Sequence, residues 1–169
     1  AFMEARTPRT SCGQRALPIA TGINNTALGK NTMENLNTGA NNTAIGMNAL
    51  RANTTASSNT AIGFEALNAN NGPRNTAVGY RALSANTAGT DNTAVGYLAL
   101  STNLTGDYNT AVGYQALRYN TGSSNTALGY YALRDNTSGT NNTAAGVRCL
   151  TNNTNGSQNS GMGYECLAA

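Results

Sequence analysis

The chain has 169 residues, of which only 10% are charged, and its formal net charge is +3. Asparagine occurs 27 times and threonine 24 times, whereas histidine and tryptophan are absent. Because the few basic residues are spread thinly, the sequence lacks the clustered Lys and Arg that nucleic-acid-binding proteins carry. It also lacks a run of about 18 apolar residues, so we expect no membrane-spanning segment.

Residues 1–8 show no periodicity, and we expect them to form an N-terminal arm. A single repeat domain is predicted for residues 9–169, because a nine-residue motif recurs through this range. The first copy is degenerate, reads RTSCGQRAL and begins at Arg9. The fullest form is N-T-A-V-G-Y-x-A-L, as in NTAVGYRAL from Asn75, and we number its positions 1 to 9.

Each later copy begins with an asparagine at position 1, and we call this residue the anchor. Counted from Arg9, the copies follow at intervals of 16, 17 and 17 residues, and this triplet occurs three times, which gives a superperiod of 50 residues. The anchors are Asn25, Asn42, Asn59, Asn75, Asn92, Asn109, Asn125, Asn142 and Asn159.

The repeat length decides the fold class. A helical repeat holds two helices and needs roughly 33 residues or more, which this repeat does not have. Glycine at position 5 supplies the positive φ that turns require, and the pieces Thr-Ala-Val and Tyr-x-Ala-Leu suit short strands. We therefore predict an all-β protein, a parallel β-solenoid or β-roll of about ten 16–17-residue coils. Each coil is expected to have two short strands and two corners.

In-register stacking predicts ladders of identical side chains. The anchor asparagines should form one amide ladder, and the tyrosines of position 6 should stack on one another. These tyrosines are Tyr80, Tyr97, Tyr114 and Tyr130. A second asparagine follows position 9 by three residues in most copies and should form another ladder: Asn53, Asn70, Asn86, Asn103, Asn120, Asn136 and Asn153.

The two faces of the Thr-Ala-Val strand are both small or apolar. Alanine at position 3 points to one face, and threonine at position 2 shares the other with the aliphatic residue at position 4. Strands that are apolar on both faces are usually covered on both. The uniform alanine indicates a close backbone, either the second side of the same roll or a neighbouring chain in a trimer. For the threonine we favour an inward hydroxyl that bonds along the stack.

A threonine row that faced outward would instead match the flat faces that ice-binding solenoids display. The row consists of Thr26, Thr43, Thr60, Thr76, Thr93, Thr110, Thr126 and Thr143.

Cys149 and Cys166 both occupy position 8, one coil apart. Stacking would place their Cα atoms about 4.8 Å apart, which is within the range of a disulfide. Two small apolar residues in place of alanine are the favoured interpretation, and a disulfide is the alternative. Cys12 occupies position 4 of the first copy, where we expect it to be buried.

The sequence offers little for catalysis, for a metal or for a cofactor, and we expect none of them. The carboxylates are scattered and do not recur in pairs: Glu4, Glu34, Glu65, Asp91, Asp107, Asp135 and Glu165. Asp91 and Asp107 occupy different repeat positions, so solvated loop acids are favoured over a calcium site. Eight N-x-S/T sequons occur, as chance predicts in so Asn- and Thr-rich a chain, at Asn24, Asn41, Asn53, Asn103, Asn136, Asn141, Asn152 and Asn155.

The segments NNTAIGMNAL, SNTAIGFEAL and DNTAVGYLAL resemble the head repeats of trimeric autotransporter adhesins of the YadA type. The N-T-A-x-G-Y-x-A-L form is also similar to repeats of phage tail-fibre and other virion-surface proteins. The resemblance to adhesin heads implies a left-handed parallel β-roll assembled as a trimer, which binds host matrix or surfaces.

We therefore expect a non-enzymatic structural or adhesive protein that forms a rigid rod in an extracellular fibre, a phage tail fibre, or a virion or cell surface. An ice-binding β-solenoid with a Thr/Asn face is the alternative. We also expect self-association, either as a lateral trimer through the Ala/Gly face or by head-to-tail stacking, and other virion or surface proteins are candidate partners.

Overall fold

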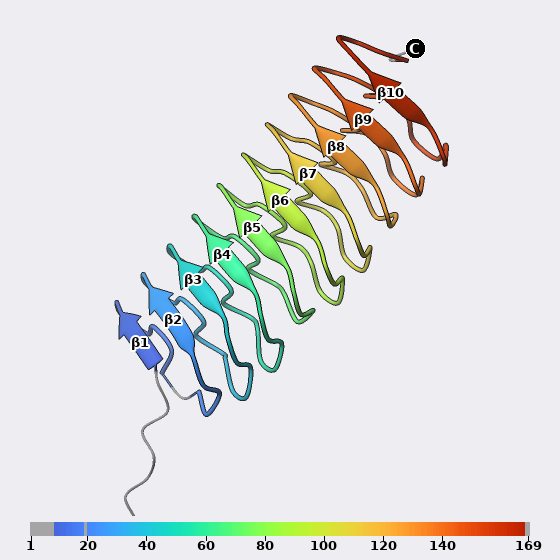
Figure 1. Cartoon of the computed structure of the whole chain (residues 1–169). Helices are drawn as coiled ribbons and strands as arrows, with labels where there is room; N and C mark the ends of the chain where they lie inside the picture. The colour runs from blue at the N-terminus through green and yellow to red at the C-terminus, as the bar shows by residue number, and fades with distance from the viewer. Residues whose placement is uncertain (1–8, 19, 168–169) are drawn as a thin grey trace, which may run out of the picture.

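The structure, a computed structural model, describes residues 9–18 and 20–167, and the expected arm at residues 1–8 lies outside this part. Within it the chain is a parallel β-solenoid, as predicted: ten strands and their connections wind into a rod of stacked coils (Figure 1). The strands are β1 (Arg9–Cys12), β2 (Asn25–Leu28), β3 (Thr43–Ile45), β4 (Thr60–Ile62), β5 (Thr76–Val78), β6 (Thr93–Val95), β7 (Thr110–Val112), β8 (Thr126–Leu128), β9 (Thr143–Ala145) and β10 (Ser160–Met162).

All ten strands belong to one sheet, and each strand pairs with its neighbours in sequence. The register keeps the repeat positions aligned, so that Thr76 lies beside Thr93 and Val78 beside Val95. Parallel strands lie about 4.8 Å apart, so ten of them make a rod about 45 Å long. The 16-residue and 17-residue coils share this register, because the extra residue lies in the loop before the strand.

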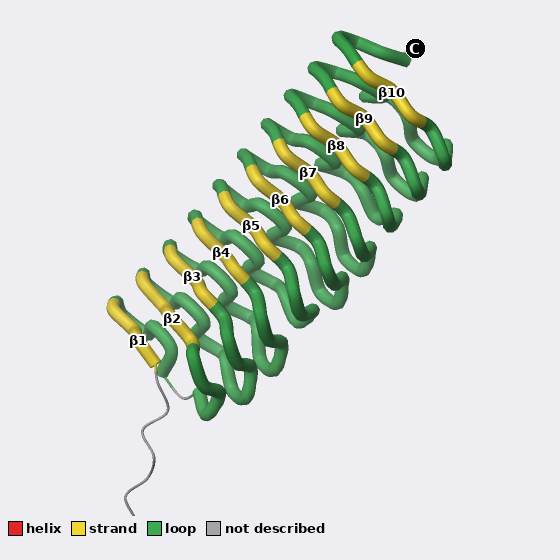
Figure 2. The backbone as a smooth tube through the Cα atoms, in the orientation of Figure 1, coloured by secondary structure: helices red, strands yellow, loops and turns green. Residues whose placement is uncertain are grey.

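Each coil has one strand, and the second strand that we predicted is wrong. The Tyr-x-Ala-Leu segment is a series of turns on the opposite side of the roll (Figure 2). Its residues at positions 7 and 9 adopt left-handed backbone conformations, for example Arg81 at φ 52° and Leu83 at φ 51°. These turns still bond from coil to coil, since the Leu83 N–H donates to the Ala99 carbonyl at 3.0 Å. We call this side of each coil the turn side.

The core is a thin layer between the strand and the turn side. Ala94 projects into it from the strand, and Ala99 and Leu100 meet it from the turn side, all with no exposed surface. The same three positions are buried in the other inner coils. The alanines of position 3 therefore lie against the second side of their own roll. The Ala/Gly face through which we expected a lateral trimer is therefore the interior of the single chain, and self-association stays a prediction.

Glycine at position 5 makes the corner where the strand ends. Gly96 has φ +136°, and a Cβ atom there would meet the carbonyl group of Gly113 in the next coil. The corner therefore needs glycine for two reasons, the positive φ and the close approach of two coils. This explains why position 5 is glycine in every copy.

Candidate binding face

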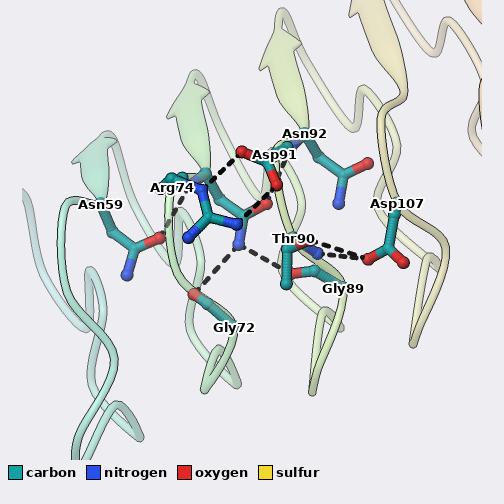
Figure 3. Close-up of polar contacts among 9 residues, drawn as sticks. Asn59, Gly72, Arg74, Gly89, Thr90, Asp91, Asn92 and Asp107 are labelled. Carbon is teal, nitrogen blue, oxygen red and sulfur yellow. Dashed lines mark hydrogen bonds and ion pairs between the residues drawn. The ribbon is translucent and has the colours of Figure 1, made fainter.

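The anchor asparagines hold consecutive coils together from inside the roll. The Asn75 N–H donates to Asn59 Oδ1 at 2.9 Å, and Asn75 Nδ2 donates to the Gly89 carbonyl of the next coil at 2.8 Å (Figure 3). Nδ2 also donates to the Gly72 carbonyl of its own coil at 3.1 Å. One side chain thus bonds to backbone groups at two corners, where Asn70 and Asn86 of the second asparagine column also donate to the Gly72 and Gly89 carbonyls.

This bonding is repeated along the rod. At each step from Asn25 to Asn159, an anchor's backbone N–H donates to the Oδ1 of the preceding anchor at 2.9–3.0 Å. The inner anchors from Asn25 to Asn125 are at most 1% exposed. Each anchor bonds to the coil that follows it. This row of anchor asparagines, which we call the anchor column, therefore has a direction.

The second asparagine column closes each coil on itself. Asn103 Nδ2 donates to the Gly106 carbonyl three residues later at 2.9 Å, and it also donates to Asn86 Oδ1 of the preceding coil at 3.0 Å. Asn53, Asn103 and Asn136 are fully buried in this column, so their sequons are not accessible for modification.

The tyrosines of position 6 stack along the rod together with Phe64. Neighbouring rings from Phe64 to Tyr130 have centroids 5.1–5.3 Å apart and planes within 14° of parallel. Each ring between Tyr80 and Tyr114 has neighbours on both faces, so the row presents ring edges and hydroxyl groups to solvent. Tyr80, Tyr97, Tyr114 and Tyr130 are 40–42% exposed.

The outward side chains of positions 2 and 4 form a surface that we call the β face. Position 2 contributes the threonine row, whose members are half-buried or exposed while the neighbouring alanines are buried, and our prediction that its hydroxyls point inward is wrong. The interior side of the strand is taken by the anchor and by alanine, because only small or hydrogen-bonded side chains fit between strand and turn side. Loop threonines bond to the chain, as Thr87 Oγ1 does to the Leu104 carbonyl at 2.9 Å, whereas within the described residues the hydroxyls of the threonine row form no such bond.

Position 4 contributes an aliphatic row beside the threonines. Its exposed members include Leu28 at 48% and Val112 at 38%. Cys12 belongs to this row and is exposed, so its predicted burial is wrong for the same reason as the inward threonines. The row consists of Cys12, Leu28, Ile45, Ile62, Val78, Val95, Val112, Leu128, Ala145 and Met162.

Charged side chains pair mainly on the turn side. Arg51 Nε lies 2.8 Å from Glu34 Oε2, and the hydrogen bond from Arg51 lowers the pKa of Glu34. Similar pairs join positions 7 of neighbouring coils, such as Arg81 with Glu65 at 2.6 Å. No residue of positions 2 and 4 is charged, so the rod has a charged turn side and an uncharged β face.

One ion pair lies at the edge of the β face, on the residue before the anchor. Arg74 contacts Asp91 of the next coil through two hydrogen bonds of 2.7 and 2.8 Å (Figure 3). The hydrogen bond from Arg74 lowers the pKa of Asp91. Asp107 accepts the Thr90 N–H at 2.7 Å, so the two aspartates bond to different groups and do not converge.

Among the described residues, no three Cys, Asp or Glu side chains form a group that could hold a metal ion. The remaining carboxylates lie in the ion pairs of the turn side, and Glu4 lies outside the described residues. In residues 9–18 and 20–167, no helix is long and apolar enough to cross a membrane.

Cys149 and Cys166 are joined by a disulfide, with their Cα atoms 4.5 Å apart. The bond links the last two coils at position 8, and Cys149 is fully buried. The interpretation favoured from sequence, two unlinked small residues, is therefore wrong. In-register stacking places the two β-carbons directly over one another, which suits a disulfide as well as it suits two alanines.

Comparison of the chain with protein-family models, with curated proteins and with solved structures gives no match. The candidate site therefore depends on the geometry of this chain alone. Its main feature is the β face, which sequence reasoning placed in the interior. The available signal was side-chain size: position 3 is nearly always alanine, whereas position 4 varies among valine, isoleucine and leucine, as an outward position allows.

Proposed function

We propose that the chain forms a rigid, non-enzymatic rod that serves as a structural or adhesive segment of an extracellular fibre, a virion or a cell surface. The observation that carries the proposal is the directed anchor column. It fastens each corner to the next from Asn25 to Asn159, so the rod resists bending and presents its side chains at fixed spacing. Rods of this kind hold other parts at a distance or display an extended surface.

The disulfide supports a location outside the cytoplasm. Disulfides persist in oxidising environments, such as the periplasm, the extracellular space and virion surfaces, and they are rare in the cytosol. The bond between Cys149 and Cys166 is buried on one side and closes a short loop of one coil. We therefore place the working protein in an oxidising compartment.

Self-association is part of the same proposal. β1 and β10 are the edge strands of the sheet, and edge strands carry backbone groups that can pair with another chain. We propose that β10 of one copy stacks beside β1 of another, which would extend the rod into a filament. Mass measurement at micromolar concentration tests this, and a stable monomer at that concentration would contradict it.

The location is tested with an antibody raised against the purified chain. We expect it to label intact cells or virions of the source organism without permeabilisation. Labelling only after permeabilisation, with reduced Cys149 and Cys166 in the native protein, would contradict the proposal. A variant in which both cysteines are replaced by alanine serves as the control for thiol detection.

A further inference from the structure

We infer that the β face binds ice, through the threonine row of position 2 and the aliphatic row of position 4. This inference goes beyond the rod function and does not depend on it. It begins from the finding that the threonines of position 2 point outward, so their hydroxyls do not bond along the interior of the stack as we expected.

The β face is a regular two-dimensional grid. Along the rod, Thr76, Thr93 and Thr110 lie side by side in paired strands, about 4.8 Å apart. Across the rod, threonine and the aliphatic residue of the same strand are two positions apart, or roughly 6.6 Å. The same pair returns in every coil from β2 to β8, so the surface repeats in both directions, as a crystal lattice does.

The chemistry of the grid suits ordered water. A threonine hydroxyl can both donate and accept a hydrogen bond, and those of the threonine row form none with the described residues, so they are free to bond to water. The methyl groups of threonine and the aliphatic side chains bind water weakly, so water next to them keeps hydrogen-bonding to itself. Charged groups would impose their own hydration geometry, and positions 2 and 4 carry none.

A second copy of this chain is the main competing occupant, and two observations count against it. The β face, roughly 6.6 Å across and about 45 Å long, covers on the order of 300 Å². A stable protein interface buries about 800 Å² on each partner and is centred on a few anchor residues in pockets. Each coil presents the same pair of a threonine and an aliphatic residue on the β face, so a second copy could bind in many equivalent registers. Ice is itself periodic and does not need a unique register.

The test uses the oxidised 169-residue chain. Thermal hysteresis is measured at rising protein concentration, together with partition of the protein into slowly grown ice. We expect hysteresis that increases with concentration and enrichment of the chain in the ice fraction. The variant T93Y/T110Y places two bulky rings in the middle of the grid, and we expect both signals to fall to the level of a protein that ice excludes.

The matched control is T55Y/T105Y, which makes the same change at two exposed threonines in equivalent loops away from the β face. We expect it to keep the hysteresis of the parent chain, and circular dichroism of both variants checks that the coils are intact. Two results would overturn the inference. One is a parent chain with neither hysteresis nor ice partition. The other is an oligomer that dissociates in T93Y/T110Y but not in T55Y/T105Y, because the β face would then be covered by a second copy.

Discussion

Asn92 Oδ1 accepts the backbone N–H of Asn109 at 2.9 Å, so a side chain of one coil bonds to the backbone of the next. The Nδ2 of Asn92 also donates to the Gly106 carbonyl at 2.8 Å. Both contacts are buried, and only an amide supplies a donor and an acceptor in this geometry. These two contacts explain why asparagine recurs at position 1.

The first prediction concerns this amide. Asn92→Ala removes both bonds. The Asn109 N–H is then buried without its acceptor, whereas the Gly106 carbonyl keeps the hydrogen bond from Asn103 Nδ2. We expect the free energy of unfolding to fall by about 3 kcal/mol, since one orphaned buried group costs about 1–3 kcal/mol and each lost hydrogen bond about 1 kcal/mol. Chemical denaturation measures the change.

Asn37→Ala is the control for this prediction, because the Asn37 side chain is exposed. Its effect should stay within about 0.5 kcal/mol, the usual range for surface substitutions. Equal losses at Asn37 and Asn92 would show that the anchor column does not stabilise the stack.

The second prediction concerns acid pH. The Arg74 hydrogen bond lowers the pKa of Asp91, and the Arg51 hydrogen bond lowers that of Glu34. A carboxylate whose folded pKa is depressed stabilises the fold above its unfolded pKa, and this contribution is lost as the pH falls through the folded pKa. We therefore expect a small decrease in Tm between pH 7 and pH 3.

Both carboxylates are at the surface, so screening by salt should reduce the decrease. The variant Asp91→Asn should have a lower Tm than the parent chain at pH 7 and the same Tm at pH 3. A difference that is larger at pH 3 than at pH 7 would contradict the assigned sign.

The sequence predicts the stack better than it predicts the faces of the strand. Repeat length, the glycine of position 5 and the asparagine columns all lead to in-register coils, because they reflect contacts between identical residues. Which face of the strand points inward is harder to predict, because a strand has two alternating faces and both are uncharged here. Whether the side chain of Ala94 or that of Val95 points into the core depends on the width of the interior, which is a property of the whole coil.

The turn side shows a second limit of sequence reasoning. Leu100 has φ 52°, a left-handed conformation that is uncommon for residues other than glycine and asparagine. Local preference predicts a strand there, and burial of the leucine side chain outweighs that preference. The only indication in the sequence is indirect: no residue at position 7 or 9 is β-branched.

The third prediction concerns the disulfide. The bond between Cys149 and Cys166 closes a loop of one coil, and a loop of this length stabilises a fold by about 3 kcal/mol. After reduction we expect faster hydrogen exchange at β10, while β5 to β7 keep their protection. Mass spectrometry of exchanged peptides measures this. Cys12→Ser is the control and should leave exchange at β10 unchanged, because Cys12 lies at the other end of the rod.

The last prediction compares one glycine substitution at two places in the stack. Gly96→Ala and Gly163→Ala both put alanine at a positive φ, +136° and +118°, which costs about 1–3 kcal/mol. At Gly96 the new Cβ also meets the backbone of Gly113, whereas at Gly163 nothing lies within 4 Å. Gly96→Ala must therefore separate two coils whose strands are hydrogen-bonded, and we expect it to lower the unfolding free energy by several kcal/mol more than Gly163→Ala. Denaturation of both variants gives the comparison, and equal losses would show that backbone strain alone, without the close approach of coils, requires glycine at position 5.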